Sequence, residues 1–322
     1  MNETPTVSII IPVKPGGSVR ALGGVRKADY PDGCIEAIVA EGRRPSRQRN
    51  LAAAAASGEI LYFLDDDSMV FPGFLQRAIC HFQDPGVAAV GGPSLTPDSD
   101  SALQHSFAMA FGSIFGGGGM RNRYRTSGKV RVSNDSELIL CNLAFRRDAF
   151  LAQGGFDERL YPNEENELLD RIKRGGWRLI HDPELFIYRS QRPTLKAFCR
   201  QLFSYGRGRG EQTLISGVVR PVTFIPPIFL VYLLLLPLAN KSVYYLPLLC
   251  YLILTVIFSI YEGIKSGKAF SAAGLPLVFS LFHLCYGAGM LRGLSGRGWR
   301  HDAGEVDEIS LCRLKDFDGE WT

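Results

Sequence analysis

Residues 60–67 read Ile-Leu-Tyr-Phe-Leu-Asp-Asp-Asp, an apolar run that ends abruptly in carboxylates. A continuous apolar run of this length is typical of a strand that is buried on both faces of a sheet. Carboxylates at a strand's end do not serve packing, because like charges this close repel each other. A hard cation such as Mg²⁺ or Mn²⁺ would suit Asp oxygens, whereas a solvated acidic turn is the alternative.

Similar apolar runs occur on both sides of this strand and alternate with helix-prone segments. The further strands are predicted at Val7–Val13, Ile35–Ala40, Val87–Val90, Leu138–Ala144 and Trp177–Ile180. The helices are predicted at Arg47–Ser57, Phe74–Phe82 and Glu165–Arg174. This alternation predicts an α/β domain with an open, parallel sheet over residues 1–190. Ligands of such sheets bind at the carboxyl ends of the strands, where Asp65 begins the acidic run.

The second half of the chain has a different composition. The formal net charge of +4 is modest, but residues 223–291 are mostly apolar. Candidate membrane spans lie at Thr223–Ala239, Val243–Tyr261 and Phe270–Leu291, each close to the ~20 residues that cross a bilayer core. We therefore expect an α-helical membrane module at 221–292 and a C-terminal tail at 293–322.

The membrane topology poses a conflict. The N-terminus has neither a basic start nor a cleavage site, so the first domain is expected to stay in the cytoplasm. Three full crossings would then place the tail outside, yet Arg292, Arg297 and Arg300 after the last span favour the cytoplasm. We expect one span to be re-entrant or interfacial, and the sequence does not say which.

A basic segment at 191–220 precedes the spans. Its apolar residues recur with helical spacing at Leu195, Phe198, Cys199, Leu202 and Phe203. This amphipathic helix either lies in the membrane interface or packs on the first domain. Its basic residues suit an anionic membrane surface, and no recognition motif supports binding of nucleic acid.

Glycines and cysteines give weaker indications. Gly116–Gly119 are four consecutive glycines, which predict a flexible loop or, alternatively, a mobile lid. The seven cysteines form no CxxC pair, which fits a reducing compartment and predicts no disulfide framework.

Several segments together resemble family 2 glycosyltransferases of the GT-A fold. Arg49-Asn50, followed by the segment 58–67 from Gly58-Glu59 to Asp67, is similar to that family's RN…GE…DDD signature. The opening VSIIIPVK at 7–14 looks like the family's first strand. The GGFDE at 154–158 and the run from Glu164 to Trp177 are similar to its GGFDE…ED…G-W block. The matches follow in the family's order over about residues 6–210.

The resemblance implies a fold, a reaction and a location. It implies a GT-A, Rossmann-like α/β domain, followed by a membrane module of the type found in bacterial exopolysaccharide synthesis. It further implies a nucleotide-diphosphate sugar donor, a lipid-linked or glycan acceptor, and Mg²⁺ or Mn²⁺ as cofactor. The chain would be a multi-pass protein of the inner membrane with a cytoplasmic catalytic domain. The donor sugar, the acceptor and the oligomeric state stay open.

The resemblance also assigns roles to residues at the donor. Asp65 and Asp66 fall where the family contacts the ribose-diphosphate, and Asp67 with Asp65 where it holds the metal. The remaining substrate-binding positions fall on Pro12, Glu41, Arg49, Arg207 and Arg209. Glu41 stands where Asp is more common.

The family's acidic pair falls on Glu164-Glu165, with Glu165 as the catalytic base where Asp is usual. Sugar transfer needs a cation at the departing phosphate and a carboxylate to deprotonate the acceptor, so these residue types suit the reaction. A single base opposite the leaving group gives inversion. A helix N-terminus that favours acidic residues through its dipole is the alternative.

Two further positions bear on the mechanism. Tyr188 stands where relatives often carry a His that binds the metal. Tyr205-Gly206-Arg207-Gly208-Arg209 resembles the YGRGR segment of membrane-bound members, whose arginines on a flexible backbone suit a diphosphate or, alternatively, lipid headgroups. Ser204 and Tyr205 replace the Arg and Trp of the processive synthases, so single transfers are expected. A nucleotidyltransferase and a non-catalytic nucleotide-sugar-binding scaffold are the alternative functions.

Overall fold

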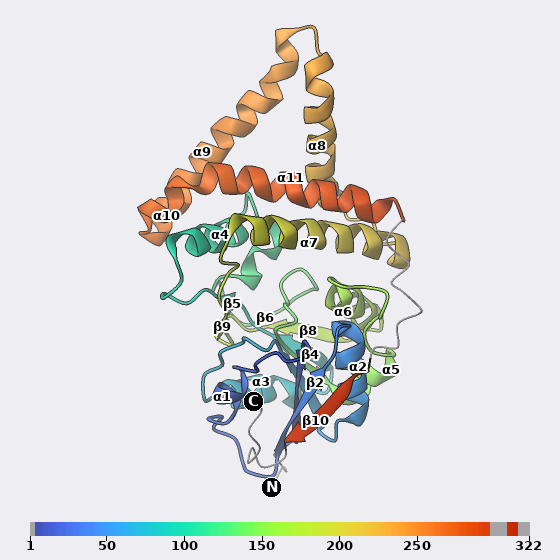
Figure 1. The fold of residues 1–322 in the computed structure, drawn as a ribbon. Coiled ribbons are helices and arrows are strands. Elements are labelled where there is room, and N and C mark those ends of the chain that lie inside the picture. Colours follow the sequence, from blue (N-terminus) through green and yellow to red (C-terminus); the bar gives the residue numbers. More distant parts are fainter. Residues whose placement is uncertain (1–3, 297–307, 315–322) are drawn as a thin grey trace. The chain divides into compact units, whose positions relative to one another are not determined.

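The computed structural model describes residues 4–296 and 308–314 and divides into two compact units (Figure 1). The sheet unit comprises residues 4–95, 122–189 and 308–314. The helical unit comprises residues 96–121 and 190–296. The segment 96–121, which the sequence places inside the first domain, thus clusters with the helices that follow it.

The sheet unit is built on an eight-stranded sheet of order β10-β2-β1-β3-β7-β4-β8-β6. Its strands are β1 (Val7–Val13), β2 (Ile35–Glu41), β3 (Ile60–Leu64), β4 (Val87–Gly91), β6 (Arg131–Val132), β7 (Asn142–Arg146), β8 (Arg178–His181) and β10 (Ser310–Leu314). A separate pair consists of β5 (Ser94–Leu95) and β9 (Ile187–Tyr188).

The sheet is mixed, so the expectation of a parallel sheet is wrong in part. β1 runs parallel to β2 and β3, with Ile10 opposite Ile38 and Phe63. β7 runs antiparallel between β3 and β4, and β10 is antiparallel to β2 at the edge. An apolar run reports burial on both faces but carries no information about strand direction. The strand expected at Leu138–Ala144 also starts later, at Asn142.

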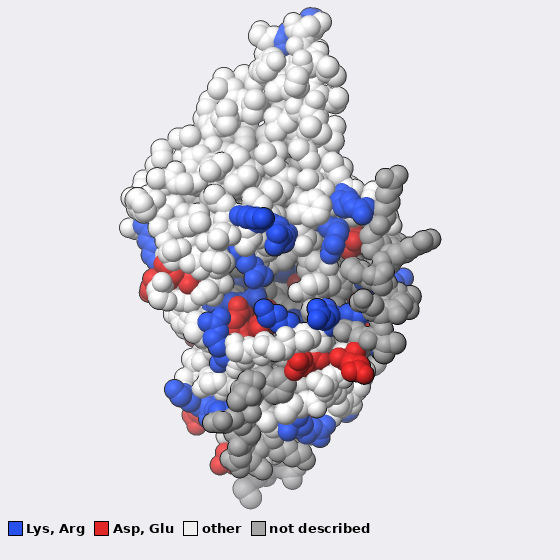
Figure 2. All heavy atoms as spheres, viewed as in Figure 1, with Lys and Arg blue, Asp and Glu red and all other residues white. Residues whose placement is uncertain are grey.

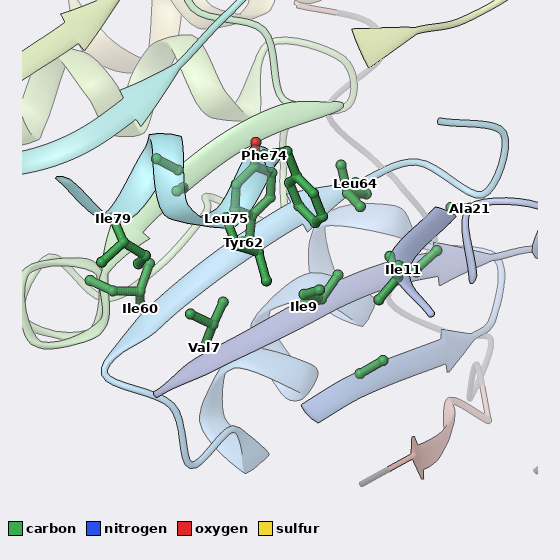
Figure 3. Packing of buried hydrophobic residues seen from close by; sticks show 14 of the residues in the cluster. Val7, Ile9, Ile11, Ala21, Ile60, Tyr62, Leu64, Phe74, Leu75 and Ile79 are labelled. Atoms are coloured by element: carbon green, nitrogen blue, oxygen red, sulfur yellow. The ribbon is translucent and has the colours of Figure 1, made fainter. Parts of the chain in front are cut away.

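Alternate residues of the central strands supply two cores, because successive side chains point to opposite faces. Ile9 and Tyr62 pack on one face with Phe74 of α3 (Phe74–Cys80) (Figure 3). Ile10 and Phe63 belong to the core on the other face. The remaining helices of the sheet unit are α1 (Leu22–Val25), α2 (Pro45–Ala55), α5 (Arg147–Ala152), α6 (Glu164–Arg174) and the 3₁₀ turn η1 (His81–Gln83).

The sequence of the helical unit explains where its helices begin. Its helices are α4 (Ala102–Gly112), α7 (Leu195–Ser216), α8 (Ile225–Leu235), α9 (Leu246–Ser266), α10 (Ala269–Ala273) and α11 (Leu275–Leu294). Its 3₁₀ turns are η3 (Pro221–Phe224), η4 (Leu236–Leu238) and η5 (Ser242–Tyr245), and η2 (Gly118–Arg123) joins the two units. Ser101 and Gln104 form a capping box at α4, and the Thr194 side chain caps α7. Proline stands in the first turn of α8, α9 and α11, where its missing N–H costs nothing.

The YGRGR segment is helical, which corrects the expectation of a flexible backbone. It lies inside α7, along which α11 runs in the same direction (Figure 1). A Cβ on Gly206 would lie 2.0 Å from the carbonyl oxygen of Tyr286, and one on Gly289 would lie 2.0 Å from that of Phe203. The glycines therefore allow two helix backbones to touch, as small residues do at close helix–helix contacts.

Two of the four consecutive glycines also make close backbone contacts. A Cβ on Gly116 would lie 2.2 Å from the carbonyl oxygen of Ala110, and one on Gly117 would lie 1.9 Å from that of Phe111. At these two positions glycine is needed for close backbone packing against the end of α4, and the flexible loop stays a prediction.

Within the part of the chain that the structure describes, three helical segments are long and apolar enough to cross a membrane: Pro221–Leu238, Ser242–Ser266 and Leu275–Leu294. The first two are only 11% buried within the protein, whereas Leu275–Leu294 is 44% buried. Figure 2 shows an almost uncharged surface over α8 and α9. The spans predicted from the sequence coincide with these segments to within a few residues, except that α10 and α11 divide the last one.

Candidate active site

The acidic run directly follows β3, at the carboxyl end of the strand. Oδ1 of Asp65 accepts a hydrogen bond from Nη2 of Arg49 at 2.9 Å. The backbone oxygen of Asp66 accepts from the N–H of Ala21 at 3.0 Å, which fixes the turn. Burial and the neighbouring carboxylates of Asp67 and Asp65 raise the pKa of Asp66. The site is therefore rich in negative charge that its own arginines do not fully offset.

Arg49 connects the acidic run to the start of α6. Its Nη1 lies 2.9 Å from Oε1 of Glu164, while its Nη2 binds Asp65. The side chain is 6% exposed, and although burial lowers the pKa of Arg49, the nearby carboxylates of Asp65 and Glu164 raise it overall. Its contacts with Asp65 and Glu164 fix the position of this buried guanidinium, which therefore holds the two acidic segments close together.

Glu164 and Glu165 open α6, whose composition follows the helix dipole. Acidic residues fill the first turn of the helix and basic residues its last turn. Burial raises the pKa of Glu164 to about 8, even though the Arg49 charge works in the opposite direction. Oε1 of Glu165 lies 3.3 Å from Nη1 of Arg123, whose side chain is also buried. The helix dipole accounts for acidic residues here, but it does not account for their burial beside the acidic run.

Arg189 contacts the acidic run from β9. Its Nε donates to Oδ1 of Asp67 at 2.6 Å, and its Nη2 lies 3.1 Å from Oδ2 of Asp65. Tyr188, the residue before it, is 42% exposed and packs against Phe186. Arg189 thus contacts the two carboxylates to which the resemblance assigns the metal.

Pro12 and Glu41, which are predicted to bind the donor, lie near the carboxyl ends of β1 and β2. Oε1 of Glu41 accepts a hydrogen bond from the N–H of Gly16 at 3.1 Å, which ties β2 to the loop after β1. Pro12 is buried and pairs with Ala40, beyond the last residue of β1 that pairs with β3. The missing N–H of proline therefore costs no hydrogen bond to β3.

Arg207 and Arg209 belong to the helical unit. Nε of Arg207 lies 3.5 Å from Oε1 of Glu211, one helical turn further on. Arg209 is buried, and its Nη1 donates to Oε1 of Gln212 at 2.7 Å. Both arginines are thus held by other residues of α7, and their assignment to a diphosphate stays a prediction.

Sequence reasoning assigned no role at the site to Arg123 and Arg189. Neither arginine lies in a segment that resembles the family's motifs. An excess of carboxylates at one place implies nearby cations, but many arginines qualify, so the sequence did not single these two out. Only the folded chain shows which arginines reach the carboxylates.

The residues present fit a divalent cation. Asp65 and Asp67 offer hard oxygen donors, and Mg²⁺ is usually held by one or two carboxylates together with substrate phosphates. Within residues 4–296 and 308–314, no three acidic, His or Cys side chains form a complete metal cage. A metal at Asp65 and Asp67 would therefore take further ligands from a bound substrate.

The chain belongs to the family described as "Glycosyl transferase family group 2", whose model matches residues 60–290. The match includes the acidic run, the start of α6 and the apolar helices. The predictions of a family 2 glycosyltransferase and of an α/β GT-A sheet domain followed by helices are confirmed.

Among curated proteins, the chain is 24% identical over 223 residues to a pre-mycofactocin glycosyltransferase of Mycobacterium tuberculosis, covering 62% of this chain and 46% of that protein. It is 32% identical over 115 residues to the succinoglycan biosynthesis protein ExoA of Rhizobium meliloti, covering 35% of this chain and 33% of that one. The chain thus spans less than half the length of these relatives.

Among solved structures, the fold matches the mannosyltransferase PcManGT of Pyrobaculum calidifontis, which was solved in complex with GDP-Man and Mn²⁺. The TM-score is 0.56 at 15% identity, and the match covers 86% of this chain and 88% of that one. At this identity the likeness concerns the fold alone.

Proposed function

We propose that the chain is an inverting, metal-dependent glycosyltransferase. It moves a sugar from a nucleotide-diphosphate sugar to a membrane-associated, polyprenyl-linked acceptor in the synthesis of cell-surface polysaccharide. The observation that carries this proposal is the link through Arg49, which brings Asp65 and Glu164 to the same edge of the sheet. Family membership, the Mn²⁺ and GDP-Man of the mannosyltransferase, and the succinoglycan relative support it.

The mechanism uses the carboxylates in two roles. A divalent cation on Asp65 and Asp67 would neutralise the departing diphosphate. Glu165 accepts the proton of the acceptor hydroxyl, whose oxygen attacks the anomeric carbon from the face opposite the diphosphate. The bond from the anomeric carbon to the diphosphate oxygen breaks with its electron pair, and the configuration at that carbon inverts.

Glu164 positions the base. Burial raises the pKa of Glu164, which favours its neutral form and so weakens its repulsion of Glu165. Arg123 holds Glu165 in place and leaves it a carboxylate oxygen for the acceptor. Glu165 is therefore the base in this proposal and Glu164 its positioning neighbour.

The pairing of β10 supports a proposal for the membrane topology. Its pairing with β2 places residues 310–314 in the same sheet as the N-terminal strands, so the chain returns to the side from which it entered. An even number of crossings is required, and α11 is the helix best suited to stay at the surface. It is the most buried of the candidate spans and packs along α7, which carries too many charges to cross.

We infer that α8 and α9 cross the inner membrane as a hairpin, with the sheet unit in the cytoplasm. A phosphatase reporter fused after Lys241, between the two helices, should be active outside. A fluorescent reporter fused after Thr322 should fluoresce inside. Phosphatase activity of a fusion after Thr322 would contradict the even number of crossings.

The reaction is tested with the full chain in membranes, given a panel of nucleotide-diphosphate sugars and Mn²⁺. Transfer should cease in EDTA and in the Asp67→Asn variant, which keeps the size of the side chain. Full activity in either condition would overturn the metal assignment. Binding of a nucleotide sugar without transfer or hydrolysis would indicate the scaffold, and release of pyrophosphate from a nucleoside triphosphate would indicate the nucleotidyltransferase.

A further inference from the structure

Arg189 binds the two carboxylates that would hold the metal. Its Nε lies 2.6 Å from Oδ1 of Asp67, and its Nη2 lies 3.1 Å from Oδ2 of Asp65. This is the two-pronged contact for which a planar guanidinium is suited. A guanidinium and a divalent cation bind the same carboxylate oxygens, so the two cations cannot both lie between Asp65 and Asp67.

We propose that Arg189 is an internal cation that competes with the divalent metal for Asp65 and Asp67, and that metal binding displaces it. This rests on the metal-dependent function proposed above and adds a residue that controls access to its metal pair. In the absence of metal, Arg189 relieves the repulsion within the acidic run. When the metal arrives, the guanidinium moves away from the carboxylates.

Two arginines contact Asp65, and their burial indicates which of them a metal would displace. The Arg49 side chain is 6% exposed and is also held by the buried Glu164. The Arg189 side chain is 22% exposed, and Asp65 and Asp67 are exposed to a similar degree, 20% and 24%. Water therefore reaches the Arg189 contacts and can replace them, whereas release of Arg49 would leave a buried carboxyl without its partner.

The backbone around Arg189 permits this exchange without unfolding. The N–H of Arg189 donates to the carbonyl oxygen of Leu95 at 2.8 Å, and that of Tyr188 donates to Met69 at 2.9 Å. The backbone is thus fixed at the end of β9. A change of side-chain rotamer is sufficient to release the carboxylates, because Arg has several rotatable bonds.

The proposal predicts how substitutions change metal affinity. Arg189→Gln removes the competing charge, so metal binding no longer requires the ion pairs of Arg189 to break. Arg189→Lys keeps the charge, but its compact ammonium lacks the fork that binds both carboxylates, so it should compete less well. Arg131→Gln is the matched control, because Arg131 is 29% exposed and binds Glu137 at 2.7 Å in the same unit.

The experiment measures Mn²⁺ binding to the full chain, purified in detergent without donor or acceptor. Free Mn²⁺ is followed by electron paramagnetic resonance during titration, which requires no catalytic activity. We expect Arg189→Gln to bind Mn²⁺ about tenfold more tightly than the wild type, equivalent to about 1.4 kcal/mol. Arg189→Lys should lie between the two, and Arg131→Gln should match the wild type.

Equal Mn²⁺ affinities of wild type, Arg189→Gln and Arg131→Gln would overturn the competition while leaving the metal-dependent reaction intact. If none of the proteins bound Mn²⁺ and the wild type transferred sugar in EDTA, the metal-dependent function would fail as well. Should Arg189→Gln not fold, the Arg189→Lys variant decides, since an affinity equal to that of the wild type contradicts the proposal.

Discussion

Gly206→Ala tests the close packing of α7 and α11. The added Cβ would lie 2.0 Å from the carbonyl oxygen of Tyr286 and 2.9 Å from the backbone N of Met290, whereas ordinary contacts begin at 3.4 Å. Both neighbours are backbone atoms, so no side-chain rotation relieves the clash. The two helices must move apart by more than an ångström, and the contacts of Gly210, Gly289 and Gly293 loosen with them.

The expected loss is the difference between two effects. Overpacking a tight contact costs about 1–3 kcal/mol, and a backbone clash lies at the upper end of that range. Alanine gains up to ~1 kcal/mol over glycine as a helix former. The net effect on the free energy of unfolding should be a loss of about 2 kcal/mol.

Thermal unfolding of the full chain in detergent measures this loss. Gly112→Ala is the control, because Gly112 lies in α4 of the same unit and its Cβ would meet nothing within 4 Å. Gly112→Ala should leave the melting temperature unchanged or raise it, while Gly206→Ala should lower it by several degrees. If the two variants melted together, the glycines of the YGRGR segment would not be there for packing.

Three further predictions concern the sheet unit. The raised pKa of Glu164 means that the folded state binds its proton more tightly than the unfolded state does. The free energy of unfolding should therefore fall as pH rises from about 4.5 to about 8. Thermal unfolding at a series of pH values should show that Glu164→Gln lacks this part of the decline. Asn142→Leu leaves buried partners without a hydrogen bond, the Tyr62 hydroxyl at 2.7 Å and the Leu185 carbonyl at 2.6 Å. It should lower the free energy of unfolding by about 2–4 kcal/mol without changing Mn²⁺ affinity, and an unchanged melting temperature would contradict this. A fragment of residues 1–190 should be soluble without detergent, and partition of the folded fragment into membranes would show that the domain division is wrong. The fragment should unfold at a lower temperature than the same fragment joined by a flexible linker to residues 308–322, because β10 covers the edge of β2.

The strands and helices around the acidic run were predictable because burial leaves a mark on composition. The apolar runs at 7–13 and 60–64 coincide with β1 and β3, and the Ala-rich segment coincides with α2 to within two residues at each end. The direction of β7 was not predictable, since it depends on where the chain re-enters the sheet. β10 was not predictable because the strand Ser310–Leu314 is short and mixed in character, and because it pairs with a strand that is far away in the sequence.

The carboxylates of the candidate site were found by their spacing and context, while their cations were not. Asp65 and Glu164 are marked by motifs, but the link between them depends on the length and direction of the Arg49 side chain. Arg189 could not be assigned from the sequence, because the resemblance points to the adjacent Tyr188 and one position along an extended segment reverses the side on which a side chain lies. The role of the glycines in α7 was not predictable either, since glycine permits both flexibility and close approach, and only the neighbouring helix α11 decides between them.

The most direct test of the proposed reaction compares Glu165→Gln with Glu164→Gln in a transfer assay with the full chain in membranes. Loss of a general base costs about two to four orders of magnitude in rate. We expect Glu165→Gln to lower the rate constant for transfer to that extent while donor affinity stays within a few fold, since the base acts in the transition state. Glu164→Gln should be the milder change, and a more damaging Glu164→Gln would exchange the two roles. If neither substitution slowed transfer by even tenfold, the base would lie elsewhere and the proposed mechanism at α6 would be contradicted.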